Sequence, residues 1–153
     1  MTTQLTRLCC AATAMAAAGV LVSCSGFGPT HSHVSSAVIK HFKGLPNHVS
    51  VPIGQRMGQH QRPWAAWAGS RTIYVMTWGS GSCPKIPTSV EMPEANTVVI
   101  NTVEHDFYSG DDACTADLAV TTSVVRLPSS VDPTNTLVAQ IDGTTTRLAP
   151  RSG

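Results

Sequence analysis

The feature that most constrains the fold is a segment near the end of the chain in which two five-residue runs flank the pair Asp142-Gly143. Asp-Gly is a preferred pair for a two-residue type I′ turn, because both positions of that turn require a positive φ. In this register one side of the two runs is mostly apolar, and its pairs are Leu137 with Leu148, Ala139 with Thr146 and Ile141 with Thr144. The segment therefore predicts a β-hairpin with one face turned toward a core.

Three further segments carry the residue types that favour strands. Residues 71–78, 97–103 and 116–127 are rich in β-branched and aromatic side chains, and turn residues follow the first at Gly79–Ser82 and the third at Pro128. Several short strands separated by turn signals are typical of an antiparallel sandwich. We therefore expect an all-β domain, a small antiparallel β-sandwich.

One short helix is expected ahead of these strands. Val34, Val38, Phe42 and Leu45 recur at near-helical spacing, and the glycine and proline of residues 44–46 would end a helix there. From Pro46 to Pro63 the sequence has no clear period, so no element is predicted in that stretch.

The beginning of the chain has the composition of an export signal. Residues 1–7 carry the positive amino terminus and one arginine, and residues 8–22 are uncharged and rich in alanine. A positive segment, a short apolar segment and small residues before a cut define a secretory signal peptide. The apolar run is also shorter than the ~20 apolar residues that a transmembrane helix needs. Residues 1–23 are therefore predicted to be a cleaved signal peptide.

The end of this segment, Leu21-Val22-Ser23-Cys24, closely resembles the lipobox of bacterial lipoproteins. That resemblance implies a lipid on the sulfur of Cys24, cleavage just before it, and a place on the extracytoplasmic face of the cell membrane. Two or three acyl chains anchor a protein stably, whereas one binds only marginally. The alternative is an ordinary secretory signal that is cleaved elsewhere. Residues 24–37 are then a lipidated tether, and residues 38–153 form the β-sandwich-like domain.

The cysteine count agrees with export. Of five cysteines, Cys9 and Cys10 lie in the removed segment and Cys24 takes the lipid, which leaves Cys83 and Cys114. An even remainder in an oxidising compartment indicates one disulfide. The alternative, a thiolate metal site, lacks a second cysteine pair or a nearby histidine.

The charge balance argues against one class of partner. The chain has 10 Lys and Arg against 9 Asp and Glu, so the mature protein is close to neutral once Arg7 is removed. No basic cluster interleaved with aromatic residues is visible. We expect no nucleic-acid partner.

A second resemblance concerns the domain itself. Residues 78–84, 114–117 and 125–128 resemble parts of small secreted actinobacterial domains of unknown function, over roughly residues 64–148. The resemblance implies a fold and a location but no activity.

Two loops contain residue types that are common in catalytic or cation-binding sites. The stretch Gly79–Ser82 lacks the lysine of a phosphate loop, and Trp78 stands where a nucleophile elbow around Ser80 needs glycine, so a turn is expected. A second loop carries crowded carboxylates that could hold a cation through oxygen ligands, although the EF-hand spacing is absent. The candidates for this acidic loop are Glu104, Asp106, Asp111 and Asp112.

Tryptophans form the last candidate set. Trp64, Trp67 and Trp78 stand out in a chain that is 5% aromatic. Such residues either fill a sandwich core or, exposed together, form a platform for a glycan or a peptide.

The sequence thus predicts a lipid-anchored envelope protein that acts as a non-enzymatic binding or structural module. The membrane is its expected partner through the acyl chains on Cys24, together with an envelope protein or a glycan, and no cofactor is expected. The alternative is a small-ligand or metal-ion-binding lipoprotein that uses the acidic loop at residues 104–112.

Overall fold

The chain folds into strands alone throughout the part that the structure describes. The computed structural model describes residues 35–49, 61–105 and 113–151. Its strands are β1 (Val38–Lys43), β2 (Trp64–Gly69), β3 (Thr72–Gly79), β4 (Lys85–Glu94), β5 (Thr97–Glu104), β6 (Ala119–Arg126), β7 (Leu137–Ile141) and β8 (Thr144–Leu148). The predicted signal peptide and most of the predicted tether lie outside the described residues, and no helix long and apolar enough to cross a membrane occurs within them.

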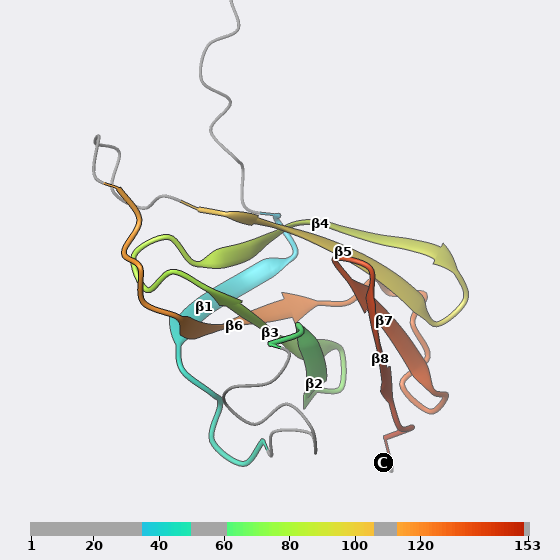
Figure 1. The fold of residues 1–153 in the computed structure, drawn as a ribbon. Helices are drawn as coiled ribbons and strands as arrows, with labels where there is room; N and C mark the ends of the chain where they lie inside the picture. The colour runs from blue at the N-terminus through green and yellow to red at the C-terminus, as the bar shows by residue number, and fades with distance from the viewer. Residues whose placement is uncertain (1–34, 50–60, 106–112, 152–153) are drawn as a thin grey trace, which may run out of the picture. The chain divides into compact units, whose positions relative to one another are not determined.

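The strands form two sheets (Figure 1). The first, here called sheet A, has the order β1-β6-β3-β2 and is antiparallel throughout. The second, sheet B, has the order β4-β5-β7-β8 and contains one parallel pair, β5 with β7. The predicted all-β, two-layer fold is confirmed, and the parallel pair makes sheet B mixed.

The main core lies between the two sheets. Sheet A contributes Ile73, Val75 and Val125, which are fully buried, and sheet B contributes a matching apolar set. Burying one such side chain stabilises the fold by about 1.5–3 kcal/mol. The members from sheet B are Val98, Ile100, Leu137, Ala139, Ile141 and Leu148.

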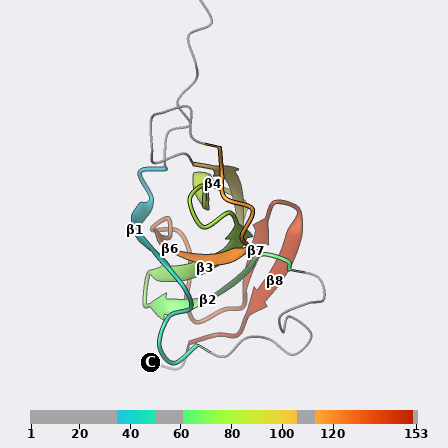
Figure 2. The same ribbon diagram turned by 60° about the vertical axis from the view of Figure 1, so that its left-hand side comes forward.

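The predicted hairpin is confirmed residue by residue. β7 and β8 pair in the expected register, with Leu137 opposite Leu148 and Ile141 opposite Thr144. Asp142 and Gly143 have φ angles of 46° and 77°, as a turn with two left-handed positions requires. The hairpin lies beside β2 (Figure 2), where the indole Nε1 of Trp67 donates to the carbonyl of Ala149 at 2.8 Å.

The predicted helix at residues 34–45 is wrong, because residues 38–43 form β1. Val38 and Phe42 are four residues apart, a spacing that fits a helix but also puts two residues on one face of a strand. The edge of β6 decides the matter, since β1 pairs with it from Val38 to Lys43. A register shift between Val38 and Lys40 then places Val38 and Phe42 on opposite faces of the sheet.

Two further strands, β2 and β4, were not predicted, and both lie at sheet edges. β2 is rich in alanine, which is uncommon in strands. β4 contains Pro87 and Pro93, which usually argue against a strand. Proline is tolerated at an edge because the missing N–H faces away from the neighbouring strand.

Sheet A is buried on its outer face as well. Trp64, Met76 and Thr122 alternate with the core-facing residues of β2, β3 and β6, yet each is at most 2% exposed. The chain just after β1 lies against this face, since the Thr122 hydroxyl donates to the Gly44 carbonyl at 2.6 Å. The outer face of sheet B is polar by contrast, and there Asn101 Nδ2 donates to Ser89 Oγ at 2.9 Å.

Candidate functional site

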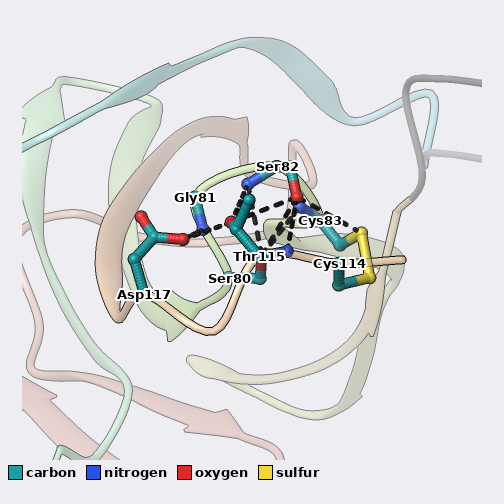
Figure 3. Close-up of a disulfide and its surroundings, with 7 residues drawn as sticks. All are labelled: Ser80, Gly81, Ser82, Cys83, Cys114, Thr115 and Asp117. Carbon is teal, nitrogen blue, oxygen red and sulfur yellow. Dashed lines mark hydrogen bonds between the residues drawn. A yellow bond between two sulfur atoms is a disulfide. The ribbon is translucent and has the colours of Figure 1, made fainter. Parts of the chain in front are cut away.

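The densest group of polar interactions outside the strand ladders surrounds the disulfide. Cys83 lies between β3 and β4, and Cys114 lies between β5 and β6, so each is on a segment that crosses from one sheet to the other. Their Cα atoms are 5.5 Å apart and the sulfurs are bonded (Figure 3), which confirms the predicted pairing. The bond therefore ties together the two crossovers at one end of the sandwich.

Three hydroxyl groups surround this bond: those of Ser80, Ser82 and Thr115 (Figure 3). Ser80 Oγ accepts the backbone N–H of Ser82 at 3.2 Å and that of Cys83 at 3.3 Å. Thr115 N–H donates to Ser82 Oγ at 2.9 Å, and the hydroxyls of Ser80 and Thr115 are 2.9 Å apart. Because the Ser80 oxygen accepts bonds within its own turn, the stretch Gly79–Ser82 fits a structural turn better than a nucleophile elbow.

Asp117 completes this group. Its Oδ1 accepts the backbone N–H of Gly81 at 3.0 Å and the hydroxyl of Thr115. The bond from the Thr115 hydroxyl, then the bond from Gly81, and last the charge of Lys43 hold the pKa of Asp117 below its ordinary value. A carboxyl with a lowered pKa stabilises the folded state above its unfolded pKa of about 3.9 and loses this effect as the pH falls further.

Gly81 is needed at its position because of this carboxylate. A Cβ atom built on Gly81 would lie 2.2 Å from Oδ2 of Asp117. We expect Gly81→Ala to push the Asp117 side chain away, so that its two hydrogen bonds are lost and its pKa rises toward the ordinary value. NMR titration of the side-chain carboxyls measures this change. Asp132 is the matched control, because Thr134 lowers its pKa in the same way. An unchanged Asp117, or an equal shift of Asp132, would contradict the proposed contact.

A hollow of about 220 Å³ lies beside the disulfide turn. This volume is below the ~300–1,000 Å³ of typical small-molecule sites, so the hollow suits one small polar group. Its lining combines an ammonium group, hydroxyls and an aromatic ring. The lining residues are His41, Phe42 and Lys43 from β1, Gly81, Ser82 and Pro84 from the crossover, and Thr121 from β6.

Of the acidic loop, the structure describes only one candidate ligand. Glu104 ends β5 and lies directly opposite Lys85 in the ladder with β4. Asp106, Asp111 and Asp112 lie outside the described residues. In the described ranges, no three His, Cys, Asp or Glu side chains come together as metal ligands would.

The three tryptophans do not share one face. Trp64 is 2% exposed on the outer face of sheet A, and Trp78 lies on the same face and is half-buried. Trp67 points to the opposite side, where it packs against the core between the sheets. Trp67 therefore packs against the core of the sandwich and Trp64 is buried on the outer face of sheet A, so the three indoles do not form a common platform.

The outer face of sheet A buries two side-chain N–H groups, those of the Trp64 and Trp78 indoles. Among the residues that the structure describes, the buried indole Nε1 atoms of Trp64 and Trp78 have no hydrogen-bond partner, and the same is true of Ser123 Oγ between the sheets. A buried donor without a partner costs about 1–3 kcal/mol. The area that the two rings bury must offset this cost.

Sequence reasoning missed Thr115 and Asp117 as members of the group around the disulfide. Only their position in the sequence could have indicated this. Thr115 and Asp117 follow Cys114 closely, so a disulfide from Cys114 to Cys83 brings residues 80–82 next to them. Comparisons with protein-family models, with curated proteins and with solved structures find no match to this chain.

Proposed function

We propose that this protein is a lipid-anchored module of the cell envelope, held on the extracytoplasmic face of the cell membrane by acyl chains on Cys24. It binds or supports another envelope component, a protein or a glycan, and carries out no reaction itself. Residues 24–37 join the proposed lipid anchor to the domain.

The observation that carries the proposal is the disulfide between Cys83 and Cys114. Such a bond forms and persists in oxidising compartments and is rare in the cytosol. A folded domain that depends on it belongs outside the cytosol, which is where the residues around Cys24 would direct it. A lipid on Cys24 of the lipobox would then keep the exported protein attached to the membrane.

Three features support a binding or structural role over catalysis. Ser80 and Ser82 lie next to the disulfide, and their hydroxyl oxygens accept hydrogen bonds from backbone N–H groups of their own turn and of Thr115. The adjacent hollow is small for a substrate. The outer face of sheet B, with Ser89, Asn101 and Gln140, offers hydroxyl and amide groups of the kind that bind glycans and polar peptides.

The decisive experiment concerns Cys24. We expect Cys24→Ala to move the protein from the membrane fraction to unprocessed or soluble material, because the thioether to the lipid cannot form. Fractionation with immunoblotting measures the distribution, and mass spectrometry of the native mature protein measures the acyl mass on its first residue. Cys9→Ala is the matched control, since it removes a thiol from the discarded segment and should leave fractionation unchanged. An unmodified thiol at the mature amino end would overturn the proposal.

A further inference from the structure

Charge is distributed unevenly along this chain. The first 90 residues contain no Asp or Glu, and all nine acidic residues lie from Glu91 onward. The same first part carries most of the cationic side chains. From Cys24 to Val90 these are Lys40, Lys43, Arg56, Arg62, Arg71 and Lys85. A charge asymmetry between two halves of a chain points to an interaction with a charged surface.

The strands of the two sheets also differ in charge. The four strands of sheet A contain no acidic residue, whereas they carry Lys40, Lys43 and Arg126. The strands of sheet B hold three glutamates against two cations. Sheet A is therefore the cationic layer of the sandwich, and two of its cations lie on one edge strand.

That edge strand is β1, which has a neighbour on one side only. Lys40 and Lys43 are exposed and point to opposite faces of the strand. A lysine can lay its apolar stem along the protein surface while its ammonium group stays in water. Either side chain can therefore extend past the unpaired edge of β1. Ile39 on β1 is 48% exposed, and Leu45, two residues after the end of the strand, is 40% exposed.

The position of β1 in the chain limits how far this edge can lie from Cys24. Val38 is 38 − 24 = 14 positions after Cys24. A chain of that length spans at most about 50 Å. β1 is thus the first strand beyond the lipid, and every other strand of sheet A follows it. Cations and apolar side chains together on one surface suit a layer of anionic headgroups over acyl chains.

We propose that the exposed edge of β1 docks on anionic phospholipid headgroups, through Lys40 and Lys43. The inference rests on the proposed function, because the lipid on Cys24 keeps the domain near the bilayer. Each lysine near an anionic surface changes the ratio of docked to undocked domain by about fivefold, so both together account for about 30-fold. Exposed ionic contacts of this kind weaken as salt rises.

The test is hydrogen exchange at the β1 backbone in the full chain, with vesicles of pure phosphatidylcholine and with vesicles containing about a third phosphatidylglycerol. The readout does not depend on how the chain is attached, because exchange reports contact at β1 itself. We expect exchange at β1 to slow with phosphatidylglycerol vesicles only. Lys40→Gln with Lys43→Gln should lower the docked-to-undocked ratio about 30-fold. Lys85→Gln with Arg147→Gln removes the same charge from sheet B and should leave the ratio unchanged.

Equal exchange with both kinds of vesicle, or equal losses in the two double variants, would overturn the inference. Protection of β1 by soluble polyphosphate without protection by the vesicles would also overturn it, in favour of a polyanion site. Mass spectrometry of Cys24 in the same samples separates the two proposals. If Cys24 carries acyl chains but β1 is not protected, the proposed function stands and docking is refuted. If β1 is protected but Cys24 carries no acyl chains, docking stands and the proposed lipid anchor is refuted.

Discussion

Replacing Cys83 and Cys114 together by serine is expected to lower the free energy of unfolding by about 3.5–4 kcal/mol, because the bond closes a loop of 31 positions. In the chain-entropy account, this loop restricts the unfolded chain far more than the folded one. The expected fall in melting temperature is about 10–20 °C for a domain of this size. The bond also joins two of the crossovers between the sheets, the one from β3 to β4 and the one from β5 to β6.

Thermal unfolding followed by circular dichroism measures the change. The wild-type protein in the presence of a reductant should match the double variant, and the double variant itself should not respond to the reductant. A melting temperature that the double substitution leaves unchanged would show that the crossovers hold without the bond.

The second large effect is expected from Ile100→Ala on β5. Ile100 is fully buried between the sheets and pairs with Ile141. Its truncation removes buried methyl groups and leaves a cavity, which costs about 2–5 kcal/mol. Urea unfolding gives the difference in free energy.

Ile39→Ala is the control of identical chemistry, because Ile39 is 48% exposed. It should change the free energy of unfolding by no more than about 0.5 kcal/mol. Equal effects of the two substitutions would contradict the assignment of Ile100 to the core and of Ile39 to the surface.

The hairpin shows where a single sequence is sufficient. Asp142 and Gly143 require left-handed backbone angles, and the alternation from Leu137 to Leu148 assigns each side chain to a face. Every partner in this unit lies within a dozen residues, so local chemistry defines the register. The runs that became β3, β5 and β6 were recognisable for a similar reason, since β-branched residues are typical of buried strands.

β1 and β4 show where local patterns fail. The spacing from Val38 to Phe42 fits a helix and a strand equally, and pairing with β6, some 80 positions away, decides between them. Pro87 and Pro93 disfavour a strand in general but are harmless at the edge that β4 occupies. Whether a strand lies at an edge depends on the other strands of its sheet.

The site around the disulfide divides in the same way. Counting cysteines was enough to pair Cys83 with Cys114, because the compartment and the even remainder left one partner for each. The contact of Asp117 with Gly81 was invisible, since residues 36 positions apart meet only when both crossovers are in place.

Residue order alone was enough for the all-β class, the hairpin register and the disulfide, because each follows from short-range chemistry or from a count. Three-dimensional pairing was needed to assign strands to sheets, to add the parallel β5–β7 pair and to bury both faces of sheet A. It also placed Lys40, Lys43 and Arg126 on sheet A, apart from the glutamates on the strands of sheet B. These properties arise from contacts between distant segments, whose entropy of closure is overcome only when the whole core forms.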